Sequence, residues 1–191
     1  MRIIGGELGG RRLVEWEASG IRPMRDFVRT AMFNILADFV PEARFLDLFA
    51  GTGSIGLEAL SRGATSCTFV DRSAEACAIV RRNLDVLGLL HRGEVVESDA
   101  FTAVARFGRR NRRYDLVFVG PPYYGELAPQ ALVALADGRA LGEDPVVVAE
   151  IHESEEIGSV YGCLRQVDHR TYGDNQLFFY RRIESRGEGG E

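Results

Sequence analysis

The stretch "LDLFAGTGSIGLEAL", residues 46–60, decides the fold. Its apolar start predicts a buried strand, and residues 54–63 predict a helix that a glycine ends. At the junction of the two, Gly51, Gly53 and Gly56 match the spacing G-x-G-x-x-G. Glycine lets the backbone turn tightly and approach a ligand closely. The stretch therefore predicts a ligand-binding loop between a strand and a helix.

Strands and helices alternate around this loop. Strands are expected at residues 44–49, 66–71, 93–98, 114–119 and 145–151, and helices at 24–38, 54–63, 73–88, 100–107 and 127–137. Such alternation predicts βαβ units and a parallel sheet covered by helices on both faces. The end differs, because residues 164–172 and 175–182 predict two strands joined by Gly173-Asp174, a hairpin signal. The expected fold class is α/β: a doubly wound, mostly parallel sheet with an antiparallel C-terminal hairpin strand.

The composition is that of an ordinary globular domain. The chain has 191 residues, of which 46% are hydrophobic and 27% charged. No apolar run approaches the roughly 18 residues of a membrane span, and residues 1–6 lack the apolar segment of a signal peptide. We therefore expect a cytosolic protein. Cys67, Cys77 and Cys163 lie far apart, so we expect three small buried hydrophobes and no metal site.

The charge distribution is uneven. The net charge of −5 argues mildly against a nucleic-acid partner, and all 23 basic residues are arginine, as codon usage in a GC-rich genome would produce. Residues 106–113 nevertheless hold five arginines and no acid, and arginines also outnumber acids over residues 2–29. This asymmetry allows a basic face for RNA, although a solvated loop explains residues 106–113 equally well.

Three acids at predicted strand ends separate two possible cofactors. The glycine spacing alone fits both a dinucleotide and S-adenosylmethionine. Asp47, four residues before Gly51, would repel a pyrophosphate but suits a ligand with an ammonium group, as S-adenosylmethionine has. Asp71 can hold ribose hydroxyls, and Asp99 can accept from an adenine amino group. For each acid alone, a helix N-cap is the plain alternative.

A stiff turn follows the fourth predicted strand. In "DLVFVGPPYYG", residues 115–125, two successive prolines fix φ and remove two backbone donors, so a buried strand cannot continue through them. The turn places Tyr123 at the carboxyl end of a strand. Open α/β sheets bind their ligands at this edge.

Together these motifs resemble the Rossmann-like S-adenosylmethionine methyltransferases that modify exocyclic amino groups. More closely, the chain resembles the bacterial 16S ribosomal RNA guanine-N2 methyltransferase family, RsmD. The resemblance extends over nearly the whole chain, through "RIIGGELGGRRL", "RPMRDFVRTAMFNIL", "LDLFAGTGSIGLEALSRGA", "FVDRSAEA", "YDLVFVGPPY" and "YGDNQLFFYRR". It implies S-adenosyl-L-methionine as cofactor, and 16S ribosomal RNA, within the small ribosomal subunit, as substrate of a monomeric enzyme.

The sequence also predicts a division of the chain, and the resemblance implies a cofactor site. The Gly-rich, basic N-terminus predicts a small β-hairpin extension that contacts RNA over residues 1–22, followed by the methyltransferase domain over residues 23–184 and a disordered tail over residues 185–191. The implied cofactor-binding residues are Arg22, Asp26, Asp47, Phe49, Ala50, Gly51, Thr52, Gly53, Asp71, Arg72, Asp99 and Ala100. Thr30 departs from the family, which usually has glutamate there.

The implied catalytic turn is Gly120, Pro121, Pro122 and Tyr123. In the family, an Asp or Asn side chain and the first proline's carbonyl accept from the amino group of the target base, and the aromatic ring stacks on that base. Here position 120 is glycine, so the side-chain acceptor is absent. The chain is then a weakened natural variant, uses another acceptor, or carries an engineered substitution.

Rival functions follow from the same residues. A methyltransferase acting on an adenine or cytosine amino group fits the turn as well. Gly120 also fits a catalytically silent relative that binds ribosomal RNA or assembly factors. A dinucleotide dehydrogenase ranks last, because Asp47 and the Pro-Pro-Tyr turn have no role in one.

Overall fold

The computed structural model describes residues 1–14 and 24–183. The strands are β1 (Arg44–Leu48), β2 (Ser66–Asp71), β3 (Gly93–Glu97), β4 (Tyr114–Val119), β5 (Leu141–His152), β6 (Val160–Tyr161), β7 (Leu164–Tyr172) and β8 (Asn175–Arg182). The helices are α1 (Asp26–Ile35), α2 (Ser54–Ser61), α3 (Ala74–Val86), α4 (Ala100–Arg109) and α5 (Leu127–Asp137). None of these helices is long and apolar enough to cross a membrane.

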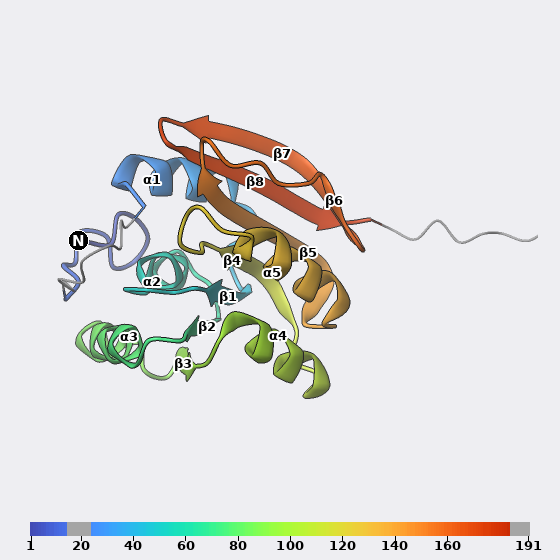
Figure 1. Cartoon of the computed structure of the whole chain (residues 1–191). Helices are drawn as coiled ribbons and strands as arrows, with labels where there is room; N and C mark the ends of the chain where they lie inside the picture. Colours follow the sequence, from blue (N-terminus) through green and yellow to red (C-terminus); the bar gives the residue numbers. More distant parts are fainter. Residues whose placement is uncertain (15–23, 184–191) are drawn as a thin grey trace, which may run out of the picture.

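One sheet organises the described residues. Its order is β3-β2-β1-β4-β5-β8-β7-β6 (Figure 1). Strands β1 to β5 pair in parallel, β8 runs antiparallel to β5, and β7 runs antiparallel to β8. The predicted α/β fold class, with a mostly parallel sheet and an antiparallel C-terminal hairpin strand, is therefore confirmed.

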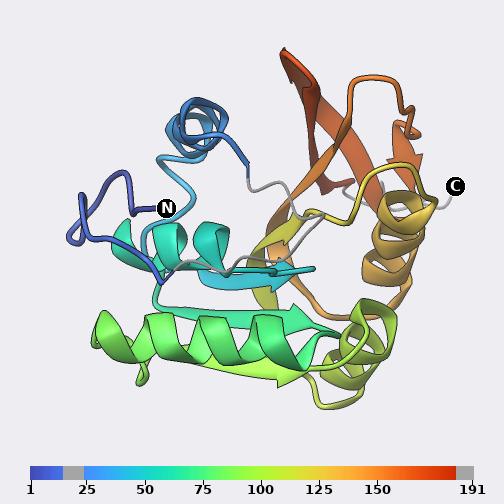
Figure 2. The same cartoon turned by 60° about the vertical axis from the view of Figure 1, so that its left-hand side comes forward.

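Helices cover both faces of the sheet (Figures 1 and 2). On one face, Phe33 of α1, Leu57 of α2 and Val80 of α3 belong to one buried apolar cluster. On the other face, Phe107 of α4 and Leu132 of α5 belong to a second cluster. The inner strands are apolar on both sides because both sides are buried, as is usual in parallel sheets. Cys67 and Cys77 are buried among these residues and Cys163 is partly buried; all three are free thiols.

Residues 1–14 are held against α2. A single antiparallel bridge joins Arg2 to Arg12, and Ile3 is fully buried. The Ile4 and Gly5 N–H groups donate to the two oxygens of the buried Glu58 carboxylate, at 2.7 and 2.8 Å. This segment is thus anchored to the domain. The rest of the expected extension, residues 15–22, and the expected tail, residues 185–191, lie outside the described residues.

Some boundaries differ from those expected from the sequence. Strand β5 begins at Leu141, four residues before Pro145, because the β4–β5 pairing continues through an irregularity between Tyr114 and Leu116. Pro145 suggested the start of the strand because proline has no N–H for the sheet. An irregular part of a strand tolerates a proline, however, so β5 continues through it. Strand β6, with two residues, is too short to leave a periodic pattern.

Candidate active site

The ends of β1 and β4 lie side by side at the carboxyl edge of the sheet. Leu48 is in register with Val70 of β2 and with Val119 of β4. The N–H of Gly120 donates to the carbonyl of Leu48 at 3.3 Å. The glycine loop after β1 and the proline turn after β4 therefore start next to each other, as their positions at strand ends predict.

The glycine loop has an unusual backbone. Phe49, Gly51 and Gly53 have φ values of 63°, 53° and 76°. The left-handed region is strained for a residue with a Cβ, so Phe49 is held there by its surroundings. At Gly53, an added Cβ would also lie 2.9 Å from a methyl carbon of Val80. Strain of this kind clusters at functional sites.

Asp47 lies beneath this loop and not on its open side. Its side chain is 1% exposed, and its Oδ2 accepts the N–H of Gly56 at 3.0 Å. Burial raises the pKa of the Asp47 carboxyl to about 8; the Gly56 N–H lowers that pKa and the nearby Asp71 carboxylate raises it further. A cationic ligand over the loop would stabilise the ionised form of this carboxyl.

Asp71 ties the end of β2 to the glycine loop. Its Oδ2 accepts the N–H of Gly51 at 2.8 Å, and its Oδ1 accepts the N–H of Ser73 at 2.9 Å. An ionised carboxylate has about four acceptor positions, so both oxygens retain capacity for ribose hydroxyls. The neighbouring Arg72 is exposed.

Asp99 is the N-cap of α4. Its Oδ1 accepts the N–H of Thr102 at 2.9 Å, and this bond is the main cause of the lowered pKa of the Asp99 carboxyl. Asp99 therefore has the helix N-cap role that was the alternative to a ligand contact. Its side chain is nevertheless exposed at the same edge of the sheet as the glycine loop. Ala100, which follows it, is buried.

Arg22 and Asp26 are the N-terminal members of the implied cofactor-binding set. Arg22 lies outside the described residues. Asp26 begins α1 and pairs with the fully buried Arg29 at 3.2 Å and with Arg2 at 3.6 Å. Nε of Arg29 in turn lies 3.9 Å from the Glu58 carboxylate. Asp26 thus belongs to an ionic network that joins α1, α2 and the N-terminal segment.

Two residues that the sequence analysis did not identify hold Tyr123. The Tyr123 hydroxyl donates to Oε1 of Glu150 at 3.1 Å, and Nδ2 of Asn175 donates to both the hydroxyl and this Oε1 at 2.6 Å. Burial raises the pKa of the Glu150 carboxyl. Burial and the Glu150 carboxylate also raise the pKa of the Tyr123 phenol. The sequence signal for this pair is Glu150, an acid inside the apolar run of residues 145–151.

The glycine at position 120 has a steric reason in this chain. Gly120 is not in the left-handed region, so its backbone accepts other residues. A Cβ built there would, however, lie 2.5 Å from Cε1 of the Phe118 ring. Phe118 is buried, and its ring occupies the space that a side chain at position 120 would need.

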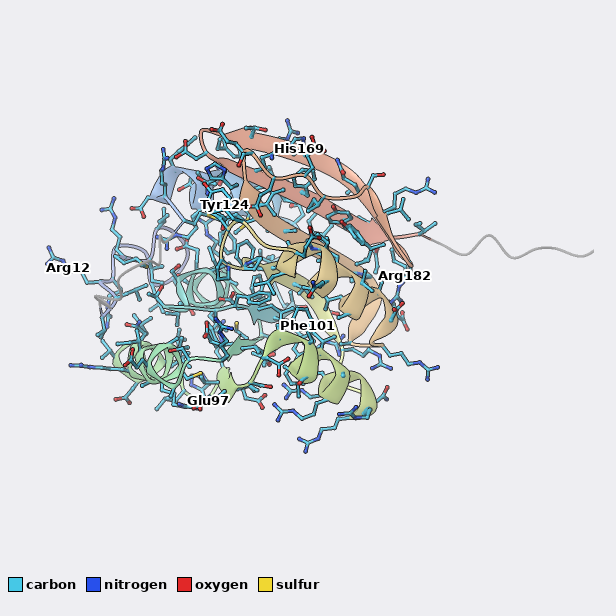
Figure 3. The ribbon with its side chains drawn as sticks, in the orientation of Figure 1. Arg12, Glu97, Phe101, Tyr124, His169 and Arg182 are labelled. Carbon is cyan, nitrogen blue, oxygen red and sulfur yellow. The ribbon has the colours of Figure 1, made fainter. Side chains whose placement is uncertain are left out.

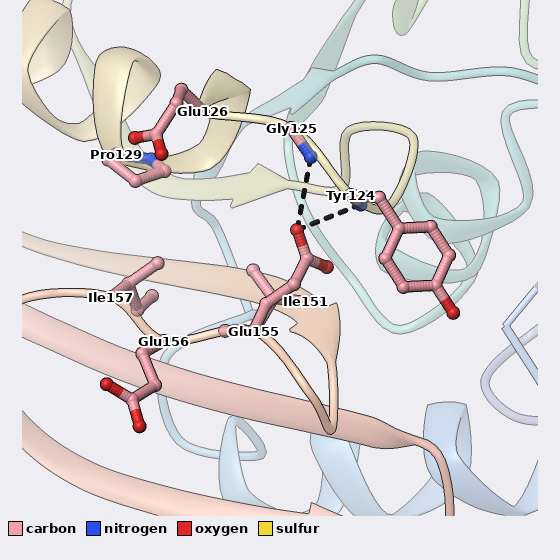
Figure 4. A pocket seen from close by; sticks show the side chains of 8 residues that line it. All are labelled: Tyr124, Gly125, Glu126, Pro129, Ile151, Glu155, Glu156 and Ile157. Atoms are coloured by element: carbon pink, nitrogen blue, oxygen red, sulfur yellow. Dashed lines mark hydrogen bonds between the residues drawn. The ribbon is translucent and has the colours of Figure 1, made fainter.

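The turn continues into a second tyrosine held by a carboxylate. Tyr124 has a φ of 64°, and Oε1 of Glu155 accepts the N–H groups of Tyr124 and Gly125 at 2.9 and 3.2 Å (Figure 4). A cavity of about 360 Å³ opens beside this contact, with Glu126 and Glu156 among its lining residues. The cavity lies next to the proline turn and includes no residue of the glycine loop.

We expect Asp47→Asn to change how stability depends on pH. The Asp47 carboxyl has a pKa of about 8 when folded and about 4 when unfolded. Its neutral form favours folding, so its contribution is present below pH 4 and is lost as the pH rises through 8. An asparagine stays neutral, so the variant should become more stable relative to wild type at pH 8 than at pH 5, by on the order of a few kcal/mol.

Urea unfolding at both pH values measures this difference. Asp38→Asn, which changes an exposed acid after α1, is the matched control and should show no such gain. Equal pH dependence of the wild type and Asp47→Asn would show that Asp47 is ionised in the folded protein.

Comparison with known proteins agrees with this geometry. A family described as "Conserved hypothetical protein 95" matches residues 1–181. The ribosomal RNA small subunit methyltransferase D of Escherichia coli is 35% identical over 188 residues, covering 98% of this chain and 92% of that protein. YlbH of Bacillus subtilis is 34% identical over 182 residues, covering 95% and 99%. The solved structure of yhhF from Escherichia coli has a TM-score of 0.84 and 31% identity, covering 95% of this chain and 97% of that one. The chain belongs to the family of conserved hypothetical protein 95, which is the family of ribosomal RNA small subunit methyltransferase D.

Proposed function

We propose that this chain transfers a methyl group from S-adenosyl-L-methionine to the exocyclic N2 of a guanine in 16S ribosomal RNA. The observation that carries the proposal is the contact between Gly120 and Leu48, which sets the proline turn directly beside the glycine loop. Similarity to ribosomal RNA small subunit methyltransferase D supports the RNA substrate. As such an enzyme, the protein would act in the cytosol, as a monomer.

The residues at the carboxyl edge of the sheet fit S-adenosyl-L-methionine. A Cβ built at Gly51 meets no atom within 4 Å, so the space over the loop is open. Asp71 offers acceptors for ribose hydroxyls, Asp99 is exposed next to it in strand order, and the buried Asp47 favours positive charge above the loop. When bound, S-adenosylmethionine supplies an electrophilic methyl group on a sulfonium.

The turn orients the nucleophile. The lone pair of an exocyclic amino group is delocalised into its base, so acceptors aimed at its protons favour the pyramidal form that can attack. The carbonyls of Gly120 and Pro121 are available as such acceptors on a turn that two prolines stiffen. The Tyr123 ring is the stacking surface for the base, and Glu150 and Asn175 fix its orientation through the hydroxyl.

Glu150 is the candidate for the acceptor that position 120 lacks. Val119 is in register with Ala149 of β5, so Glu150 occupies the neighbouring strand beside Gly120. Its raised pKa makes its carboxylate a better proton acceptor than an ordinary surface acid. This placement supports the account in which another side chain compensates for glycine.

The basic residues near the N-terminus are the proposed RNA face. Sδ of Met1 lies 3.6 Å from Oγ1 of Thr52, so the start of the segment formed by residues 1–14 lies next to the glycine loop. Arg12 projects outward from it (Figure 3). The arginine-rich residues 106–113 instead connect the end of α4 to the start of β4, at the opposite edge of the sheet. We therefore propose that Arg2, Arg11 and Arg12 contact phosphate.

Incubation with tritiated S-adenosylmethionine tests the function. Small ribosomal subunits and naked 16S RNA, both free of methylation at the target, are offered separately. We expect label in the RNA of the subunits, and loss of most of it with Tyr123→Ala, because stacking on the base contributes about 1–3 kcal/mol.

Gly120 supports one rival, an RNA-binding relative without activity. If the protein binds S-adenosylhomocysteine and RNA but leaves both RNAs unlabelled, this rival is correct and the proposed reaction is wrong.

Replacing Asp71 tests the cofactor site. Asp71→Ala removes a charged acceptor and should weaken S-adenosylhomocysteine binding by about 1–3 kcal/mol in calorimetry. Asp85→Ala, which removes an exposed acid on α3, is the matched control and should bind normally. Unchanged affinity of Asp71→Ala would remove Asp71 from the site. Tighter binding of NAD than of S-adenosylhomocysteine would contradict the choice of cofactor.

Replacing Gly120 tests the missing acceptor. Gly120→Asp alone should lose about 1–3 kcal/mol of stability, because its Cβ overpacks the Phe118 ring. Adding Phe118→Leu should restore stability. If the missing acceptor limits the reaction, the double variant should methylate roughly 10²–10³-fold faster than Phe118→Leu alone, by analogy with oxyanion-hole donors. If Glu150 compensates for the glycine, the two variants should react at the same rate.

Rates at saturating cofactor and urea unfolding are measured side by side on these variants. If the double variant folds and binds cofactor normally but reacts no faster than Phe118→Leu, glycine does not limit the enzyme and Glu150 becomes the acceptor to test.

A further inference from the structure

Tyr124 is displayed at the surface in a strained conformation. The residue is 73% exposed, and its φ of 64° lies in the left-handed region. A residue with a Cβ rarely adopts this conformation unless neighbouring groups hold it there. The proline turn positions Tyr123, but it does not explain why the ring of the next residue, Tyr124, is exposed.

The Glu155 side chain maintains this conformation. Its Oε1 accepts the N–H groups of Tyr124 and Gly125, and its Oε2 accepts the N–H of His152 at 2.9 Å. Hydrogen bonds to an ionised acceptor are stronger than neutral ones, so one carboxylate can hold the loop against its strain. Among the described residues, the Glu155 side chain accepts these bonds from backbone N–H groups. Tyr124 lines the same cavity as Glu156 and Ile157, and its ring points away from these two side chains (Figure 4).

Three aromatic rings cluster at this point, and the planes of Tyr123 and Tyr124 are inclined by 82°, so each ring offers its own face. The centroids of the Tyr124 and His152 rings are 5.0 Å apart. The centroid of the Tyr123 ring lies 5.5 Å from that of His152 and 6.4 Å from that of Tyr124. The Tyr123 ring is fixed through its hydroxyl, whereas Tyr124 is fixed through its backbone. The surface thus extends the proposed base-stacking ring by one more aromatic position.

We propose that Tyr124, backed by His152, stacks on the unpaired nucleotide next to the target base, and that Glu155 is its positioning residue. This inference rests on the proposed function. A base that is taken out of its stack leaves its neighbour with an uncovered face, and aromatic side chains cover such faces whatever the base. The second ring would therefore lower the cost of exposing the target.

The charges around the ring agree with a base as the partner. Glu126, Glu155 and Glu156 line the cavity on one side of Tyr124, and they disfavour a phosphate there. The ring points away from Glu126 and Glu156 (Figure 4), so a base stacked on it would not bring its phosphate beside these two carboxylates.

A fluorescent oligonucleotide tests the stacking directly. The probe is a short single-stranded RNA with one guanine and 2-aminopurine at the adjacent 5′ or 3′ position, titrated with the protein saturated with S-adenosylhomocysteine. We expect the wild type to quench 2-aminopurine at one of the two positions. Tyr124→Ala should lose that quench and raise Kd roughly 5- to 150-fold, the range that 1–3 kcal/mol per stacked base gives.

The control variants separate stacking from folding. Tyr124→Phe should keep the quench, and Phe39→Ala, which removes a 41% exposed ring before β1 at the opposite edge, should leave Kd unchanged. With small subunits as substrate, Tyr124→Ala should raise KM and leave kcat within about twofold, because the ring acts on binding. Glu155→Ala should weaken binding in wild type but add no further loss to Tyr124→Ala, because it acts through that ring.

The outcomes distinguish this inference from the proposed function. Unchanged Kd, quench and KM in Tyr124→Ala, in an enzyme that methylates RNA, would overturn the inference alone. A quench that depends on Tyr124 in a protein that methylates no ribosomal RNA would support the stacking surface and contradict the proposed reaction.

Discussion

Two carboxylates hold the glycine loop, and the site depends on them. Asp47 binds the N–H of Gly56 from beneath, and Asp71 binds the N–H of Gly51 from the side of β2. A loop with three residues in the left-handed region would not keep that shape alone. Keeping Asp47 buried has a cost, visible in its raised pKa. The protein thus retains an unfavourable buried acid where a cationic cofactor would offset its charge.

The register of the sheet brings the second half of the site to this loop. Because β1 pairs with β4 and β4 with β5, the loop, the proline turn and Glu150 share one edge. The antiparallel β8 then brings Asn175 beside Glu150, so the two meet at Tyr123. Each contributing side chain stands on a strand end or next to one, which gives the rigid site that the proposed reaction requires.

The sequence was informative where local pattern decides structure. Apolar runs and glycine stops predicted the parallel strands and their helices, and strand ends predicted that Asp71 and Tyr123 lie at the same edge of the sheet. The sequence was uninformative where the structure depends on which strands pair with one another. Glu150 and Asn175 lie 25 residues apart on antiparallel strands, and no spacing rule joins them. The conflict between Phe118 and a side chain at position 120 is likewise a matter of ring packing.

Identifying the methylated nucleoside tests most directly whether the site at the carboxyl edge of the sheet acts on guanine. Small ribosomal subunits are labelled with tritiated S-adenosylmethionine and the protein, their 16S RNA is digested to nucleosides, and these are separated and assigned by mass spectrometry. The account predicts that the label is in N2-methylguanosine and depends on Tyr123. Label in N6-methyladenosine or N4-methylcytidine would contradict it, and would mean that the turn holds a different amino group.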